Sequence, residues 1–111
     1  DVAAGLLDSY HRGALRGAMS RHVGVLRTPD GLRQAREILA TLTRNVSAGV
    51  EPTRRAFEAT NMLTIASAVV AAAMARTESR GCHRRTDFAG PQQEWERHLT
   101  AELVAGEMEV R

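Results

Sequence analysis

This sequence has almost no cysteine, no lysine and few aromatic residues, and each shortage excludes a class of structure. A single cysteine in 111 residues excludes an internal disulfide framework and a zinc site built from several thiolates. Aromatic residues make up only 4%, which favours helices packed through Ala, Leu and Val over a β-sandwich. The longest apolar stretch, residues 61–75, contains polar side chains and is too short to cross a bilayer, so no membrane span is predicted.

All fifteen basic residues are arginines, and they are dispersed along the chain. The formal net charge is only +2. A nucleic-acid-binding domain usually gathers its basic residues on one face or in one run. We therefore interpret most of these arginines as solvated side chains on helix surfaces and predict no nucleic-acid partner.

The composition is that of a globular domain, with 43% hydrophobic and 25% charged residues. The length suits one domain, which we expect to cover residues 1–111. The chain begins Asp-Val-Ala-Ala, with neither an initiator Met nor a basic-then-apolar signal. We therefore expect a fragment of a larger protein.

Three segments carry apolar residues at three- and four-residue spacings, which is typical of helices with one buried stripe. The predicted helices cover residues 8–26, 29–46 and 53–79. Thr28 can cap the second helix, and Pro29 suits its first turn. The inward-facing residues of the first helix are predicted to be Leu7, Tyr10, Ala14, Leu15, Ala18, Met19, His22, Val23 and Leu26. Those of the second are Leu32, Ala35, Ile38, Leu39 and Leu42. Those of the third are Phe57, Thr60, Leu63, Ala66, Val70, Ala73 and Met74.

The last third of the chain has a different character. Residues 80–94 contain Gly90 and Pro91 among many polar side chains, and we predict an irregular loop. In the tail, residues 95–111, polar and apolar side chains alternate in a way that permits a short β-hairpin, although a terminal helix fits nearly as well. The predicted fold class is thus mainly α, a three-helix bundle with an irregular loop and a short tail.

The third predicted helix is apolar on more than one face. Met62, Ile65 and Val69 widen its stripe beyond what one neighbouring helix covers. We therefore expect a partner domain on this face, or self-association of the fragment through it.

Residues that could carry chemistry are few. Cys82, His83 and His98 superficially suggest a metal site, but adjacent ligands on a loop give poor tetrahedral geometry and no fourth ligand is specified. The nine glycines form neither GxGxxG nor a phosphate-binding loop. We assign no catalytic, cofactor-binding or metal-binding residue.

A dense group of charged residues follows the third predicted helix. Gly81 lets the chain leave the helix sharply, so the side chains after it are presented together. Arginine can engage carbonyls or carboxylates through a planar fork, and a nearby aspartate can brace it. We expect domain docking through Arg80, His83, Arg85 and Asp87, with a solvated charged loop as the alternative.

The same group carries a resemblance to a known family. The residues read Glu78-Ser79-Arg80-Gly81-x-His83-x-Arg85-x-Asp87-Phe88. This pattern resembles the signature of the C-terminal domain of the succinate dehydrogenase and fumarate reductase flavoprotein superfamily. Two other stretches resemble that domain in the right order. They are Leu15-Arg16-x-x-Met19 with Gly24-Val25-Leu26-Arg27, and Glu58-x-x-Asn61-Met62-Leu63-Thr64.

Within the superfamily the sequence is most similar to the L-aspartate oxidase family. Thr86 stands where dehydrogenases and reductases tend to carry an acidic residue, and Ala89 replaces the proline that usually follows the motif. The resemblance implies a cytoplasmic parent enzyme that uses FAD to oxidise L-aspartate to iminoaspartate in de novo NAD biosynthesis, upstream of quinolinate synthase. It also implies that the FAD-binding and capping domains precede this one, so that the fragment binds no cofactor and is inactive alone. The alternatives are the corresponding domain of a succinate dehydrogenase or fumarate reductase subunit, or a free-standing helical interaction module.

Overall fold

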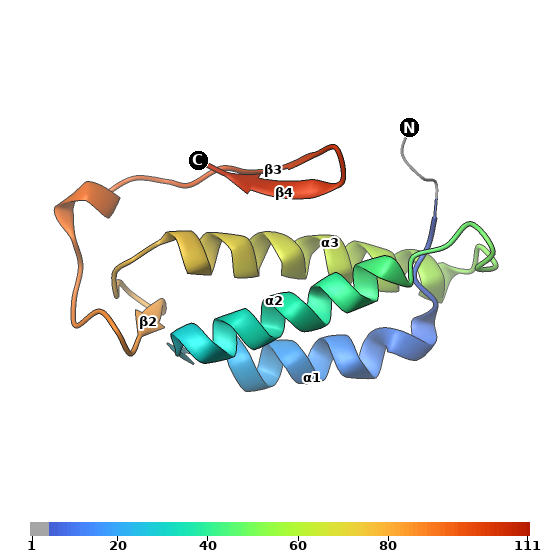
Figure 1. The fold of residues 1–111 in the computed structure, drawn as a ribbon, viewed down its shortest axis with the longest axis horizontal. Helices are drawn as coiled ribbons and strands as arrows, with labels where there is room; N and C mark the ends of the chain where they lie inside the picture. The colour runs from blue at the N-terminus through green and yellow to red at the C-terminus, as the bar shows by residue number, and fades with distance from the viewer. Residues whose placement is uncertain (1–4) are drawn as a thin grey trace.

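The structure is a computed structural model, and it describes residues 5–111. Three helices form the bundle: α1 (Arg12–His22), α2 (Pro29–Arg44) and α3 (Arg54–Ala75). A hairpin of β3 (Ala101–Val104) and β4 (Glu107–Val110) lies along α3, on the side away from α1 (Figure 1). This mainly helical architecture confirms the predicted fold class and resolves the tail as a hairpin.

Side-chain caps fix where the two longer helices begin. The Thr28 hydroxyl accepts a hydrogen bond of 2.8 Å from the Gly31 amide at the start of α2. Thr53 accepts one of 3.1 Å from the Ala56 amide at the start of α3. Such caps satisfy amides that have no partner within the helix, which explains why both helices start at these residues.

The first and third helices are shorter than the sequence predicts. A 3₁₀ turn, η1 (Ser9–His11), precedes α1, which ends at His22 because Val23 leaves helical geometry. Tyr10 and Leu26, predicted to face inward, are therefore 85% and 69% exposed. Helix α3 ends at Ala75 because Arg76 takes an extended backbone.

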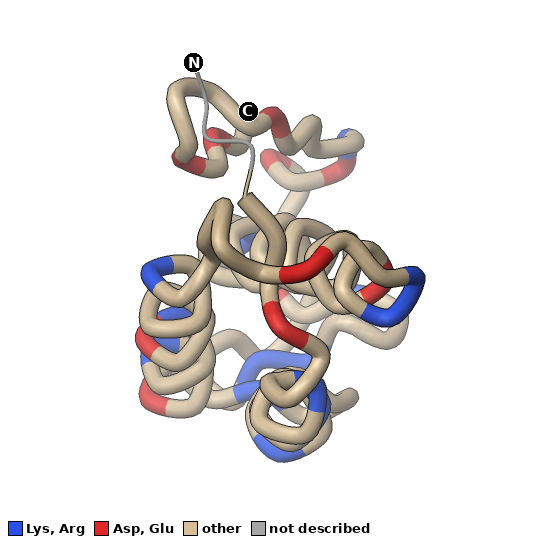
Figure 2. Tube along the Cα trace, turned by 90° about the vertical axis from the view of Figure 1, so that its right-hand side faces the viewer, with Lys and Arg blue, Asp and Glu red and all other residues tan. Residues whose placement is uncertain are grey.

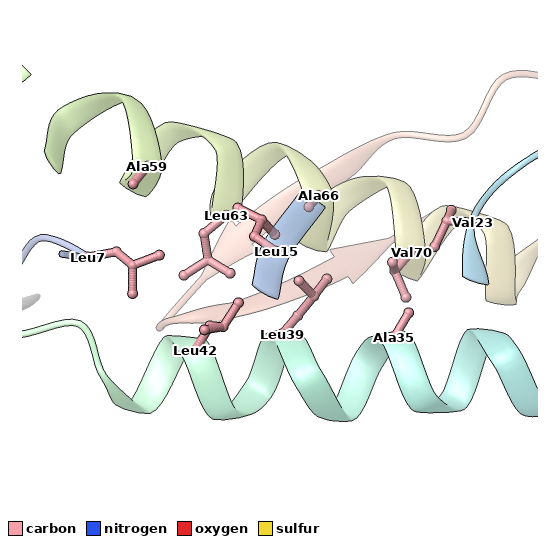
Figure 3. Close-up of a cluster of buried hydrophobic side chains, with 10 residues drawn as sticks. All are labelled: Leu7, Leu15, Val23, Ala35, Leu39, Leu42, Ala59, Leu63, Ala66 and Val70. Carbon is pink, nitrogen blue, oxygen red and sulfur yellow. The ribbon is translucent and has the colours of Figure 1, made fainter. Parts of the chain in front are cut away.

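The core lies between α3 and the other two helices (Figure 3). Helix α2 contributes its predicted inward face, whereas Phe57 at the start of α3 is half exposed. Small residues such as Ala59 and Ala66 face the other helices and permit close packing. The buried cluster consists of Leu7, Leu15, Val23, Ala35, Leu39, Leu42, Ala59, Leu63, Ala66 and Val70.

Part of the predicted irregular loop 80–94 is regular. Strand β2 (Arg84–Arg85) pairs in parallel with β1 (Leu26–Arg27). The Arg84 amide donates to the Val25 carbonyl at 3.2 Å, and the Thr86 amide donates to the Arg27 carbonyl at 2.9 Å. A second 3₁₀ turn, η2 (Gln93–Trp95), follows. The pairing explains why the chain is extended at Leu26, where the sequence predicts helix.

The hairpin turns through two residues with positive φ. Ala105 has φ 52° and Gly106 has φ 85°. Two successive residues of this kind match the twist of an antiparallel pair, which favours tight closure of β3 on β4.

Helix α3 is, by length and composition alone, apolar enough to cross a membrane. The helix includes apolar residues before the stretch 61–75 that stands out in the sequence. Core helices of soluble proteins share this property. Here α3 packs against α2, η1 and the hairpin.

Charges of both signs occur on several elements of the molecule. Arginines occur on all three helices, and acidic residues occur on the hairpin and also on α2 and α3 (Figure 2). The arginines are thus spread over several elements and not gathered in one run of the chain.

Candidate functional site: the arginine cluster after α3

The charged residues that follow α3 fold back against the end of that helix. Gly81, with φ 58°, occupies the turn between Arg80 and His83. The backbones of these two residues exchange hydrogen bonds of 2.8 and 2.9 Å. The turn directs the next residues toward β1 and back onto α3, so the sequence-predicted group forms one local structure.

Arg85 closes the carboxyl end of α3. Its Nη1 donates to the carbonyl oxygens of Met74 at 3.0 Å and Ala73 at 3.3 Å. Asp87 holds the other edge of the guanidinium through two hydrogen bonds, at 2.8 and 3.1 Å. The Phe88 ring centre lies 5.0 Å from the guanidinium carbon. Because the last carbonyls of a helix have no partner within it, a buried cation there satisfies them and complements the helix dipole.

Glu78 lies beside this cap, and its side chain is fully buried. Arg80 donates to its two carboxylate oxygens, Arg76 donates to one at 2.6 Å, and the Gln92 amide donates to the other at 2.7 Å. The hydrogen bonds from Arg80, with those from Gln92 and Arg76, outweigh desolvation and lower the pKa of Glu78 to about 2.

Ser79 joins the two arms of the cluster. Its hydroxyl accepts from the Arg85 amide at 2.8 Å and donates to the Phe88 carbonyl at 2.6 Å. The residue is 2% exposed. Sequence reasoning missed Glu78 and Ser79 as members of the site. The available signal was the motif itself, which begins with Glu78 and Ser79. Polar residues that become buried there must find hydrogen-bond partners.

His83 links the cluster to β1. Its Nε2 donates to the Arg76 carbonyl at 2.9 Å, so Nδ1 accepts from Arg27 at 2.9 Å. Partial burial, together with the charges of Arg27, Arg85 and Arg76, lowers the pKa of His83. The neutral ring therefore fits its surroundings best.

The four residues predicted for docking thus have separate partners. Arg85 and Asp87 bond to each other, Arg80 bonds to Glu78, and His83 bonds to Arg27 and Arg76. All four contribute to one internal network. Docking against a further domain stays a prediction.

Residues 5–111 offer no group of three or more potential metal-binding side chains. They also do not fit a flavin dinucleotide: the parallel pair β1–β2 is two residues long on each side, and no glycine-rich turn joins a strand to a helix there. We therefore derive no flavin chemistry from these residues.

A second feature is an apolar groove between α1 and α3, with a volume of about 320 Å³. Met62, Ile65 and Val69 line it from α3, and Leu15 and Met19 line it from α1. The three residues that widen the stripe of α3 thus share one surface, with Ile65 64% exposed.

Comparison with known proteins gives a consistent result. Residues 12–111 match the protein family described as "Fumarate reductase flavoprotein C-term". An "uncharacterized FAD-dependent oxidoreductase" of Methanocaldococcus jannaschii is 36% identical over 85 residues, which cover 73% of this chain and 16% of that protein. The L-aspartate oxidase of Streptomyces coelicolor is 36% identical over 106 residues, 88% of this chain and 18% of that protein. For the L-aspartate oxidase of Rhodospirillum rubrum the values are 43% over 74 residues, 67% of this chain and 24% of that protein. The chain thus spans less than a quarter of the length of these relatives.

Proposed function

Because the chain belongs to the fumarate reductase flavoprotein C-terminal family, we propose that it is the C-terminal helical domain of an L-aspartate oxidase. The observation that carries the choice of enzyme is the 36% identity to the L-aspartate oxidase of Streptomyces coelicolor over 106 residues. The complete protein would use FAD to oxidise L-aspartate to iminoaspartate and pass the electrons to oxygen or fumarate. It would act in the cytoplasm in de novo NAD biosynthesis and supply quinolinate synthase.

In this proposal the domain is structural. The motif residues Glu78, Arg85 and Asp87 are engaged with neighbouring side chains and with the helix end, and the described residues do not suit a flavin. The FAD-binding and capping domains of the same protein would supply the redox site, and this bundle would pack against the FAD-binding domain. The fragment alone would bind no FAD and oxidise no aspartate.

A second candidate is the corresponding domain of a fumarate reductase or succinate dehydrogenase flavoprotein subunit. It is favoured by the description of the matching family. Thr86 argues for the oxidase, since the resemblance associates an acidic residue at this position with the dehydrogenases and reductases.

The complete protein distinguishes the candidates. We expect the purified, FAD-loaded protein to produce hydrogen peroxide in air when given L-aspartate, and to show no comparable succinate-dependent dye reduction. Succinate oxidation without aspartate oxidation would identify the second candidate. The 111-residue chain, purified separately, should be colourless, and a yellow preparation would contradict the structural role.

A further inference from the structure

A cavity of about 500 Å³ lies next to the arginine cluster, and the proposed function does not use it. Three arginines and two histidines line it, together with Trp95 and one carboxylate, that of Glu96. The arginines come from two separate segments: Arg76 and Arg80 follow α3, and Arg97 follows η2. Basic side chains are thus brought to one concave site from two parts of the chain.

The wall of this cavity is held in place by specific contacts. Arg76 donates to the carbonyls of Trp95 and Arg97, both at 2.6 Å, which fixes the second segment against the first. The indole Nε1 of Trp95 donates to the Thr77 hydroxyl at 2.9 Å. The Arg97 guanidinium carbon lies 5.0 Å from the Trp95 ring centre. A cation above an aromatic ring is favourable, and here it positions Arg97 at the cavity.

Several hydrogen-bond donors at the cavity have no partner within the described residues, and Arg97 and His98 are exposed to solvent. Within residues 5–111, neither the Arg97 guanidinium nor the His98 ring makes a hydrogen bond, and Arg80 leaves its Nη1 without one. Glu78 accepts from both Arg76 and Arg80, but it carries one charge against two. Arg97 contributes a further positive charge and Glu96 a further negative charge, so the positive charges at the site still outnumber the negative ones.

We propose that this cavity binds a phosphate group, either as inorganic phosphate or as part of a small phosphate monoester. Arg97 and Arg80 donate to its oxygens from opposite segments, and His98 supplies a third donor. Donors from several segments suit a tetrahedral dianion, which offers more acceptor oxygens than one planar carboxylate. The negative charge of Glu96 repels the phosphate and limits its affinity for the site.

His83 reports on the occupancy of the site, since it lines the cavity and its two ring nitrogens are already engaged. Partial burial and the charges of the surrounding arginines lower its pKa. A bound dianion offsets their charge, so the pKa of His83 rises on binding.

The test is calorimetric titration of the complete natural protein that contains these residues, at constant ionic strength, with inorganic phosphate, glycerol phosphate and succinate. Arg97→Gln should weaken phosphate binding by about tenfold, because it removes a charge-assisted hydrogen bond. Glu96→Gln should tighten it, and Arg36→Gln, an exposed arginine on α2, should leave it unchanged. The relative affinity for the two phosphates identifies the source of the group.

Two readouts separate this site from others in a large protein. In the 111-residue chain, whose far-ultraviolet circular dichroism shows whether it is folded, Trp95 is the only tryptophan, and its fluorescence should change with phosphate in the parent but not in Arg97→Gln. The pKa of His83, followed by NMR, should rise in the same titration. Absence of phosphate binding, equal affinity in Arg97→Gln, or tighter binding of succinate than of either phosphate would overturn the proposal.

Discussion

Arg84 and Arg85 are adjacent in the sequence but occupy different environments, which makes them a matched pair. Arg85 is buried against the end of α3, and Arg84 is exposed. We expect Arg85→Ala to lower the free energy of unfolding by about 3 kcal/mol, because it leaves helix carbonyls and Asp87 without their partner. Arg84→Ala should cost less than about 0.5 kcal/mol. Urea unfolding measures both, and equal effects would mean that the cap contributes nothing.

Glu78 makes stability depend on pH in an acidic range. Its pKa, lowered to about 2 by Arg80, Gln92 and Arg76, is below the ordinary value of 4.5. The folded state therefore binds this proton less readily than the unfolded state, and stability is lost as the pH falls from about 4.5 toward 2. Glu78→Gln should remove this pH-dependent contribution to stability. The difference in unfolding free energy between parent and variant should therefore shrink as the pH falls through this range. A difference independent of pH would contradict the assignment.

The residue types in the cluster could be predicted from the sequence, but most of their partners could not. The motif identifies Arg80, His83, Arg85 and Asp87, and the bond between Arg85 and Asp87 is local enough to anticipate. The Glu78 carboxylate, in contrast, accepts one of its hydrogen bonds from the Gln92 amide. His83 accepts one from Arg27, which lies on a strand far away in the sequence. Sequence spacing carries no information on such contacts until the fold brings the segments together.

At the scale of elements, signals within a few neighbouring residues predicted where α2 begins, whereas pairings between distant segments could not be predicted from the sequence. The cap and proline that begin α2 are encoded within four residues, and that helix begins where they predict. The first helix ends early because β1 must extend to pair with β2, far along the chain. The sequence permits both a hairpin and a helix in the tail, because the alternation of polar and apolar residues there is short. In the structure, β3 and β4 pair through a tight turn.

The hairpin turn can be improved, because Ala105 adopts φ 52°. Alanine is strained there by about 1–2 kcal/mol, whereas asparagine adopts this conformation more readily because its short polar side chain can hydrogen-bond to the local backbone. We expect Ala105→Asn to raise the free energy of unfolding by about 0.5–1 kcal/mol. Thermal unfolding measures the change. Ala101→Asn, on the neighbouring strand, is the control and should not stabilise; a loss of stability in Ala105→Asn would contradict the turn geometry.

At the scale of the whole molecule, the apolar groove between α1 and α3 predicts association. We expect the isolated chain to self-associate through Ile65 and Val69, because exposed apolar surface of this kind is costly in water. Ile65→Glu should shift sedimentation velocity profiles toward monomer. Leu103→Glu, a comparably exposed leucine on the hairpin, should not. A parent chain that is monomeric at high concentration would contradict this.

The parallel pairing of β1 with β2 also bears on how the chain could be divided. A cut in the segment between α2 and α3, near Gly49, would give one piece with α1, β1 and α2 and another with α3, β2 and the hairpin. The pieces would remain joined by the β1–β2 hydrogen bonds, by the 2.8 Å bond from the Leu7 amide to the Thr60 hydroxyl, and by the core between α2 and α3. The backbone connection between α2 and α3 therefore raises the effective concentration of one piece near the other, in addition to these contacts. Expressed separately and mixed, the two pieces should reassemble into a non-covalent heterodimer with the helicity of the intact chain.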